Sequence, residues 1–284
     1  MIGVDELRLN YRFTDLFQDK NISLDAVIMD GVQVNFKTIA ETDTSRNLNI
    51  NVFVKGINKM SGSGKGGGGG MISIGEAILT NTLFTYNTDR DTLARRFDPN
   101  HFEIDAPDIE LQNFLIQGDT IQFNVRSLTA TEKKHDFTIH ELSTFYRISQ
   151  QSMEFLGIKA RAGESIISDT VRFEYTSQRD LGDFLNQVNV FASLTNTVIH
   201  PKDLAVFAPL PPNLSQPVSV SGIFKGKINR FRFSDMDIRA GNQTHLKGSL
   251  EMDGLPDINE TFILLNLKQS QVSFTDLGFL FDDK

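Results

Sequence analysis

The feature of this sequence that most limits its fold is an alternation of apolar and polar residues. In residues 22–36, ISLDAVIMDGVQVNF, the even positions 22, 24, 26, 28, 32, 34 and 36 are apolar. A side-chain period of two predicts β-strand with one buried and one wet face. Asp30-Gly31 interrupts the run, which indicates either a turn between two strands or a bulge in one long strand.

The pattern recurs fifty positions later, without a gap, in residues 72–87. The matched pairs are Ile22 with Ile72, Leu24 with Ile74, Ile28 with Ile78, Val34 with Phe84, and Phe36 with Tyr86. Repeats of a unit that cannot bury its own apolar face are typical of a solenoid or a long curled sheet.

Further short strands are predicted wherever the alternation returns. These segments are 48–57, 120–125, 137–142, 218–228, 230–233 and 260–267. Helical spacing is confined to a few places: a short helix is expected after Ser177 as its N-cap, another begins at Pro201, and a third turn is expected at 90–97.

We therefore predict an all-β fold: an elongated, curled antiparallel sheet, either a taco-like groove or a β-solenoid, with one or two short helices interrupting it. Residues 1–176 form a first segment of repeating strands with a flexible glycine-rich loop at 61–70. Residues 177–216 form a helical interlude, and residues 217–284 continue the sheet.

The glycine-rich stretch MSGSGKGGGGGM, residues 60–71, contains a lysine and so raises the question of a phosphate-binding loop. In that motif the first glycine would fall at Lys59 and the hydroxyl residue at Gly66, so both positions fail. Five consecutive glycines have no preferred backbone geometry. We predict a linker and no nucleotide-binding site.

Composition excludes several classes of function. The formal net charge is −8, and no basic stripe exists to neutralise nucleic-acid phosphates, so nucleic acid is not an expected partner. The absence of Cys rules out disulfides and thiolate metal sites. No run of about 18 apolar residues is present, so we expect this segment itself to be soluble. Twenty-three Phe against four Tyr and no Trp favours wholly apolar contacts.

No arrangement of residues indicates an enzyme. His101, His135, His140, His200 and His245 are scattered and lack metal-ligand spacing. Glu103 and Asp105 are the kind of acids a glycosidase would use, but nothing distinguishes them from strand-surface acids. We predict no catalytic residue, no metal site and no cofactor.

At this point the sequence resembles a known family. The segments NISLDAVIMDGVQVNF, RRFDPNHFEIDAPDIELQNFLIQGDTIQFNV, STFYRISQQSMEFLGIKARAGESIISDTVRFEYTS, VIHPKDLAVFAP and GSLEMDGLPDINETF are similar, in this order, to the repeating β segments of the AsmA-like superfamily. The TamB type, the inner-membrane component of the translocation and assembly module, is the nearest in pattern.

The resemblance implies a periplasmic protein that is anchored to the inner membrane in its full-length form. Its long sheet would carry phospholipid along an apolar groove toward the outer membrane and support outer-membrane assembly. The family's partner is an outer-membrane barrel protein. This sequence shows neither the membrane helix nor the domain that would engage the barrel, so barrel binding would use regions absent here.

The resemblance makes the apolar even-position residues candidates for contact with phospholipid acyl chains. The predicted groove-lining residues are Ile22, Leu24, Ile28, Val32, Val34, Phe36, Ile72, Ile74, Ile78, Phe84, Tyr86, Val218, Val220, Phe224 and Ile228. Gly222 and Gly226, beside Phe224, are expected either to bend the sheet or to leave room for an acyl chain. The alternative is a structural β-solenoid spacer or an adhesin-like envelope protein whose core is filled by its own side chains.

Overall fold

The computed structural model describes residues 2–11, 21–36, 38–42, 45–48, 71–87, 96–98, 101–207, 210, 214–257 and 259–276. The predicted linker at 61–70 lies outside these ranges. Most of the strand predicted at 48–57 and of the helical turn predicted at 90–97 also lies outside them.

The described chain is almost entirely β, with short helices and a largely antiparallel sheet, which confirms this part of the predicted fold class. The strand order is open, so the described strands form no closed tube, and the predicted curl into a groove or solenoid stays a prediction. The strands are β1 (Ile2–Gly3), β2 (Glu6–Asn10), β3 (Ile22–Asp30), β4 (Gln33–Phe36), β5 (Thr38–Thr42), β6 (Ser45–Leu48), β7 (Met71–Asn87), β8 (His101–Gln117), β9 (Thr120–Glu132), β10 (Phe137–Ile148), β11 (Ser152–Ala162), β12 (Ser165–Glu174), β13 (Asn189–Ile199), β14 (Val218–Lys227), β15 (Arg230–Ala240), β16 (Thr244–Asp253) and β17 (Phe262–Leu267). The helical pieces are η2 (Gln178–Asp183), α2 (Phe184–Gln187) and α3 (Pro201–Leu204).

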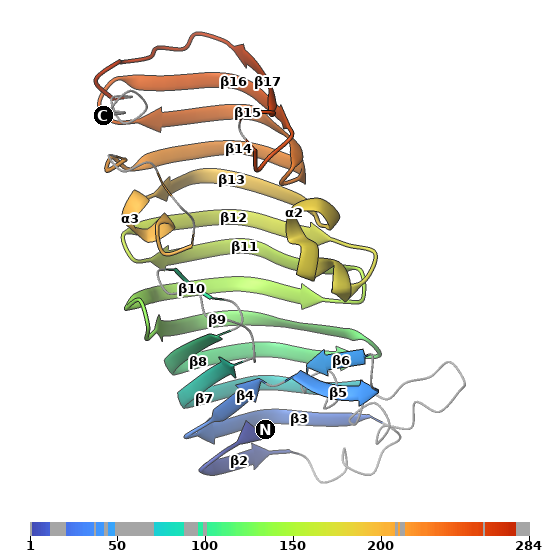
Figure 1. Ribbon diagram of the computed structural model, residues 1–284. Helices are drawn as coiled ribbons and strands as arrows, with labels where there is room; N and C mark the ends of the chain where they lie inside the picture. The colour runs from blue at the N-terminus through green and yellow to red at the C-terminus, as the bar shows by residue number, and fades with distance from the viewer. Residues whose placement is uncertain are drawn as a thin grey trace. The chain divides into compact units, whose positions relative to one another are not determined.

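Fifteen strands belong to one largely antiparallel sheet (Figure 1). The strand order is β1-β4-β7-β8-β9-β10-β11-β12-β13-β14-β15-β16-β17, with β3 also pairing with β7 and β2 with β3, while β5 and β6 form a separate ribbon. The chain divides into two compact units, Met1–Ser143 (unit 1) and Thr144–Lys284 (unit 2).

In unit 1 the two copies of the sequence repeat are neighbours in the sheet. β3 and β4 both pair in parallel with β7, and every matched pair of the repeat is a register pair: Ile22 with Ile72, Leu24 with Ile74, Ile28 with Ile78, Val34 with Phe84, and Phe36 with Tyr86. Polar residues follow the same register, since Thr80 donates a hydrogen bond to the Asp30 carboxylate. The fifty-residue offset is therefore the number of residues between a position in β3 or β4 and its register partner in β7.

The alternation of these strands shifts phase, which the sequence analysis did not predict. Leu79 and Phe84 of β7 pack against the same buried cluster of Ala106, Ile109 and Ala130. Because neighbouring residues of a strand point to opposite faces, an odd and an even position share a face only if the alternation slips by one residue between them. Asn81, with a φ of 52°, lies at this slip. A second slip lies at Gly75, which is absent from the register pairs with β3 and β8 and lies opposite Asn113, whose φ is 53°, so Ile72 and Ile74 lie on the apolar face.

Ile28 and Ile78 lie between the two slips, which corrects their predicted orientation. Ile78 precedes Leu79 and pairs with Glu110, and Ile28 pairs with Ile78, so both lie on the polar face. Ile28 is 40% exposed, whereas Val27 and Ala77 are only 5% and 4% exposed and occupy the inward positions.

Unit 2 is an antiparallel meander from β11 to β17, in which each strand pairs with the next. Most of its strands contain a β-bulge near the middle. Residues with positive φ lie at these irregularities: Gly157, Asp169, Asn196, Gly222, Asp235 and Gly248. Asn, Asp and Gly are the residues that adopt this backbone region at least cost.

The predicted helical interlude at 177–216 is only partly helical. Asp180 accepts hydrogen bonds from the backbone and hydroxyl of Ser177 just before η2, and Pro201 opens α3 as predicted. Between them, however, β13 is an 11-residue strand within the sheet. Its alternating apolar residues follow directly on residues with helical spacing, and the stronger helical signal obscured them. In unit 2, α2 and α3 lie near opposite ends of strands β11–β13 (Figure 1).

Gly222 provides room for a ring of the protein itself. A Cβ on Gly222 would lie 2.8 Å from Cζ of Phe233 and 2.9 Å from the Ser234 carbonyl oxygen, and its φ is +145°. The neighbouring Phe224 stacks on Phe231, with ring centroids 4.5 Å apart. The space beside Phe224 is thus occupied by aromatic side chains of β15.

Candidate functional site

One face of unit 2 carries two continuous rows of apolar residues. We define the first apolar row as the register-paired residues Phe155, Val171, Ala192, Phe224, Phe233, Leu250 and Leu265, one from each strand from β11 to β17. The second apolar row, on the same face, is Met153, Phe173, Val190, Gly226, Phe231, Met252 and Ile263. No charged residue interrupts either row.

These rows are partly buried and partly open to solvent. Phe233 is only 7% exposed and Val190 9%, but Leu265 is 46% and Ile263 49% exposed. Most of the other members are half-buried. A single layer of sheet leaves such side chains with contacts on one side only, so the face keeps apolar area that another apolar group can cover.

The helical segment covers one part of this face. Phe184 of α2 meets Phe173 edge-on, with ring centroids 5.2 Å apart. Leu181 and Phe184 pack against the buried cluster of Tyr175, Val188 and Val190. Burial raises the pKa of the Tyr175 phenol. Toward β17 no helix of the described chain packs on the rows.

The opposite face of unit 2 is charged. The charged row consists of Glu154, Arg172, Phe191, Lys225, Arg232 and Glu251, which are paired strand to strand from β11 to β16. Arg172 and Lys225 both lie 5.6 Å from the centroid of the Phe191 ring, a favourable cation–π geometry. Arg232 pairs with Glu251 at 3.1 Å. The two faces of unit 2 therefore differ sharply in chemistry.

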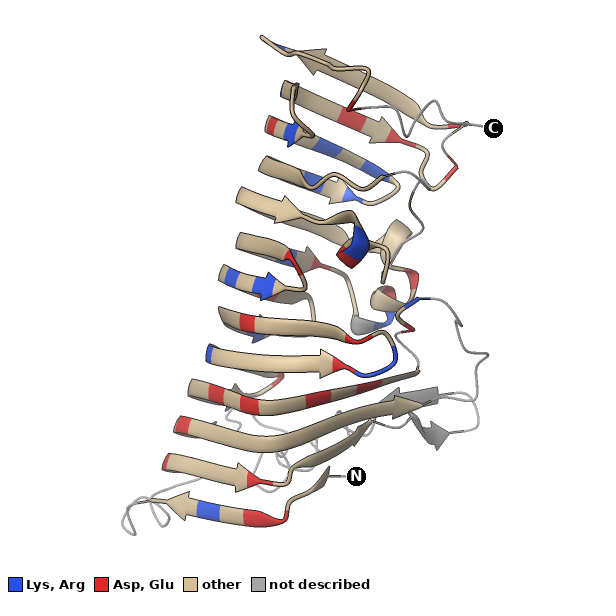
Figure 2. Ribbon diagram, turned by 90° about the vertical axis from the view of Figure 1, so that its left-hand side faces the viewer, with Lys and Arg blue, Asp and Glu red and all other residues tan. Residues whose placement is uncertain are grey.

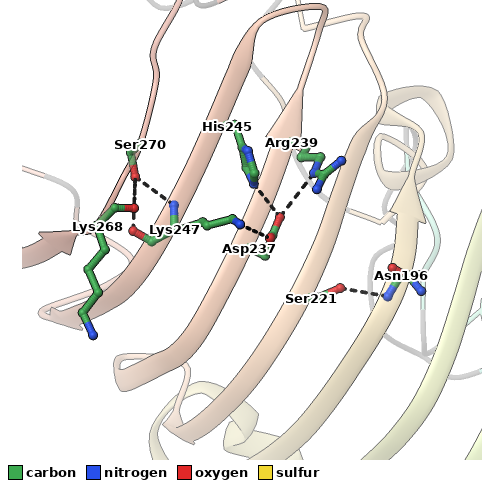
Figure 3. Close-up of polar contacts among 8 residues, drawn as sticks. All are labelled: Asn196, Ser221, Asp237, Arg239, His245, Lys247, Lys268 and Ser270. Carbon is green, nitrogen blue, oxygen red and sulfur yellow. Dashed lines mark hydrogen bonds and ion pairs between the residues drawn. The ribbon is translucent and has the colours of Figure 1, made fainter.

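A carboxylate with three basic neighbours lies on the charged face of β15 and β16 (Figure 3). Asp237 accepts hydrogen bonds from His245 Nε2 at 2.9 Å and Arg239 Nε at 3.4 Å, and Lys247 Nζ lies 3.6 Å away. Partial burial acts to raise the pKa of Asp237, but the His245 hydrogen bond and the charges of His245 and Lys247 outweigh it and hold the pKa below its usual value. This arrangement stabilises an ionised carboxylate.

Unit 1 has an apolar face of its own. Phe36 stacks on Phe84 at 6.4 Å and meets Phe102 at 6.3 Å between ring centroids, and Tyr86 lies 5.8 Å from Phe102. These aromatic residues come from β4, β7 and β8, so the ring cluster spans neighbouring strands. The outward positions of β8 carry Glu103 and Asp105.

Most of the predicted lining residues lie on the apolar face of their own unit. In unit 1 these are Ile22, Leu24, Val32, Val34, Phe36, Ile72, Ile74, Phe84 and Tyr86, and in unit 2 Val218, Val220, Phe224 and Ile228. Their exposure varies, since Val32 is 2% and Ile22 38% exposed. Ile28 and Ile78 lie on the polar face. Contact of any of these residues with lipid stays a prediction.

Sequence reasoning missed several members of the apolar rows. Phe231, Phe233, Leu250 and Met252 were not among the predicted lining residues. The alternation in RFRF and in SLEM was a sufficient signal for their faces. The strand-to-strand register that aligns them into rows is not visible in a single sequence.

The predicted histidines are not gathered into one site. His101 lies 2.9 Å from Asp98, His135 2.7 Å from Glu132 and His200 3.0 Å from Glu164, each as a separate pair. Among the described residues, no group of three or more His, Asp or Glu residues is placed to hold a metal ion. The helices described in the structure are too short or too polar to cross a membrane.

The described chain is thus a nearly all-β protein, and its unit 2 has an apolar face and a charged face on opposite sides of the sheet. Comparisons with protein-family models, with curated proteins and with solved structures gave no match.

Proposed function

We propose that this chain is a segment of a periplasmic bridge protein that carries phospholipid along an apolar β-surface between the inner and outer membranes and supports outer-membrane assembly. The observation that carries the proposal is the pair of uninterrupted apolar rows across seven strands of unit 2, backed by a charged face. The family resemblance supplies the location, the membrane anchor of the full-length protein and the barrel partner.

The physical argument concerns the cost of exposing acyl chains. Each buried methylene is worth about 0.8 kcal/mol, so a chain of about sixteen carbons loses on the order of 13 kcal/mol when it crosses water bare. Continuous apolar rows lower this cost. Because successive row positions are chemically similar Phe, Leu, Val and Met side chains, an acyl chain finds no single deep trap and is free to move along them.

The alternative, a spacer without lipid cargo, is favoured by a specific observation as well. Phe233 is nearly buried, its ring occupies the space beside Gly222, and α2 covers Phe173. These contacts are those of a self-filled core. The two proposals differ in what covers the half-exposed remainder of the rows.

A photo-crosslinking experiment separates them. A photoreactive amino acid is placed at Leu250, in the first apolar row, and in a matched variant at its neighbour Glu251, on the charged face. After incubation with phospholipid vesicles, we expect lipid adducts at 250 and few at 251, and co-purified phospholipid in native mass spectrometry. Equal labelling at both positions, or no lipid at either in folded protein, would refute lipid carriage and favour the spacer.

A further inference from the structure

β17, the last strand of unit 2 that the structure describes, pairs along one edge only among the described residues. Among the described strands β17 pairs only with β16. Just beyond it, the N–H of Lys268 donates to the carbonyl of Lys247 at 2.8 Å. Backbone groups alternate along an antiparallel strand, so those of residues 262, 264 and 266 point toward β16 and those of 263, 265 and 267 point away. The outer edge therefore presents free donors and acceptors to another strand.

This edge lacks the usual protection against pairing. β17 reads FILLNL and contains no charge and no proline, and the uppermost strand in Figure 2 is correspondingly tan. Ile263 and Leu265 continue the apolar rows, but Phe262 and Leu264, on the charged face, are apolar too, and they are 65% and 40% exposed. A partner that satisfies both backbone and side chains is a β-strand that is apolar on both faces.

We propose that the partner is a second copy of this chain, with β17 paired antiparallel to β17 across a two-fold axis. The axis that relates antiparallel neighbours of one sheet stands perpendicular to it and keeps each face on its own side. A residue must then oppose a residue of the same face, so one residue of the strand lies on the axis.

Charge selects the register. With Leu264 on the axis, Ile263 and Leu265 of the partner subunit exchange backbone hydrogen bonds. Glu260, two residues before β17, then comes near Lys268 of the partner subunit, which directly follows that subunit's β17. The symmetric contact repeats on the other side. Shifting the axis to Ile263 or Leu265 would instead place Glu260 opposite Asn266 or Ser270 of the partner subunit. Only the first register joins opposite charges at both ends of the strand pair.

Both charged residues are available for this ion pair within the described chain. Glu260 and Lys268 are exposed, and no ion pair of either side chain is formed among the described residues. Figure 3 shows the Lys268 side chain directed away from the Asp237 group. Since even-numbered residues would form the non-hydrogen-bonded pairs of the new edge, their side chains would approach most closely.

Cysteine cross-linking tests this register in the full chain, which has no Cys of its own. In Leu264→Cys the two Cα atoms across the axis would be roughly 4.5 Å apart, within the range for a disulfide. We expect a disulfide-linked dimer on mild oxidation. Leu267→Cys is the matched control, because its twin would lie about 20 Å away, six residues along the partner strand. Equal cross-linking of both variants would overturn the register.

Charge exchange provides the second test, read by sedimentation over a range of concentrations. Lys268→Glu or Glu260→Lys alone puts like charges opposite each other twice, so we expect the dimer dissociation constant to rise about tenfold. The double variant Glu260→Lys/Lys268→Glu should return it to within about twofold of the original. A wild-type chain that stays monomeric at every concentration, or a double variant no better than the singles, would refute the proposal. Circular dichroism verifies that each variant is folded.

Discussion

The Ser73 hydroxyl donates a hydrogen bond to the Ser23 hydroxyl, 3.2 Å away, across two parallel strands and a sequence separation of fifty residues. The same offset joins Thr80 to Asp30, where the hydroxyl donates to the carboxylate at 2.5 Å, and Asn81, one residue further along, donates to the same carboxylate at 2.7 Å. Polar side chains thus form contacts at the fifty-residue spacing beside the apolar ones. Because a slip of one residue would reverse every face of the strand, these contacts help to fix the register.

The phase slip in β7 makes a prediction about two adjacent residues. Ala77 is 4% exposed on the apolar face, whereas Ile78 lies on the polar face opposite Glu110. We expect Ala77→Lys to lower the free energy of unfolding by about 3 kcal/mol or more, since it buries a charge without a partner. Ile78→Lys should cost about 1 kcal/mol or less, because the ammonium reaches water and Glu110. Urea unfolding measures both, and equal losses would contradict the assigned faces.

A pair of glycines gives a matched test of close packing. Gly222→Ala would force a Cβ against the Phe233 ring at a φ of +145°. We expect it to cost about 1–3 kcal/mol of stability. Gly182→Ala is the control, since no atom lies within 4 Å of its added Cβ, and it should change stability by less than about 0.5 kcal/mol. Thermal unfolding measures both, and a tolerated Gly222→Ala would mean that the ring does not occupy this space.

Two ion pairs of unit 2 should contribute unequally. Glu154 is 5% exposed and its carboxylate lies 2.7 Å from Arg147 Nη2. In Arg230–Asp253, by contrast, both side chains are more than half exposed, at 78% and 52%. We expect Arg147→Met to cost about 1–3 kcal/mol, because it leaves a buried carboxylate unpaired. Arg230→Met should cost under about 0.5 kcal/mol. Denaturant midpoints compare them, and a neutral Arg147→Met would show that another group compensates Glu154.

The hydrogen bonds of Asp276 predict that its contribution to the stability of the folded chain depends on pH. Its carboxylate accepts backbone N–H bonds from Gln243 at 2.9 Å, Asn242 at 3.1 Å and Thr244 at 2.8 Å. The bond from Gln243, followed by those from Asn242 and Thr244, lowers the pKa of Asp276 below its ordinary value of 3.8. Because the pKa of Asp276 is lower in the folded state, the stabilisation is complete above the ordinary pKa of the unfolded chain. It is lost as the pH falls from there through the folded pKa.

The melting temperature of Asp276→Ala should therefore lie below that of the wild type at about pH 6, and the gap should close below about pH 4. Asp276→Asn is the control, because its single amide oxygen can accept the bonds from Gln243 and Thr244, which share one carboxylate oxygen of Asp276, without titrating. Its difference from Asp276→Ala should not depend on pH in this range. A gap between wild type and Asp276→Ala that is constant from about pH 6 to pH 3 would rule out a charged cap.

The fold class could be predicted because β-structure leaves a local trace. Alternation, turn residues and the fifty-residue repeat all survive in single segments, and the repeat even contains the register of β3 on β7. The phase slips could not be predicted with the same certainty, because a residue such as Asn81 looks like any polar residue on the outward face of a strand. The sign that a slip leaves in the sequence is weak: two consecutive polar residues, as at Gln112-Asn113 in β8.

The candidate surface could be predicted from the sequence only in part. The alternation placed Val220 and Phe224 on one face, because a regular strand fixes the face of each residue once its neighbours are known. The rows themselves depend on how seven strands align, and bulges at positions such as Asn196 and Asp235 set that alignment. The exposure of β17 depends on whether another strand pairs with its outer edge, and no strand of the described residues does so. A local sequence pattern carries no information on this.

The meander of unit 2, in which each strand bonds only to its chain neighbours, has a consequence for how such a chain changes over evolution. Duplication or loss of one hairpin adds or removes two strands and leaves the pairing of the remaining strands unchanged. The number of strands can then change while each remaining side chain needs only to keep its hydrophobicity class.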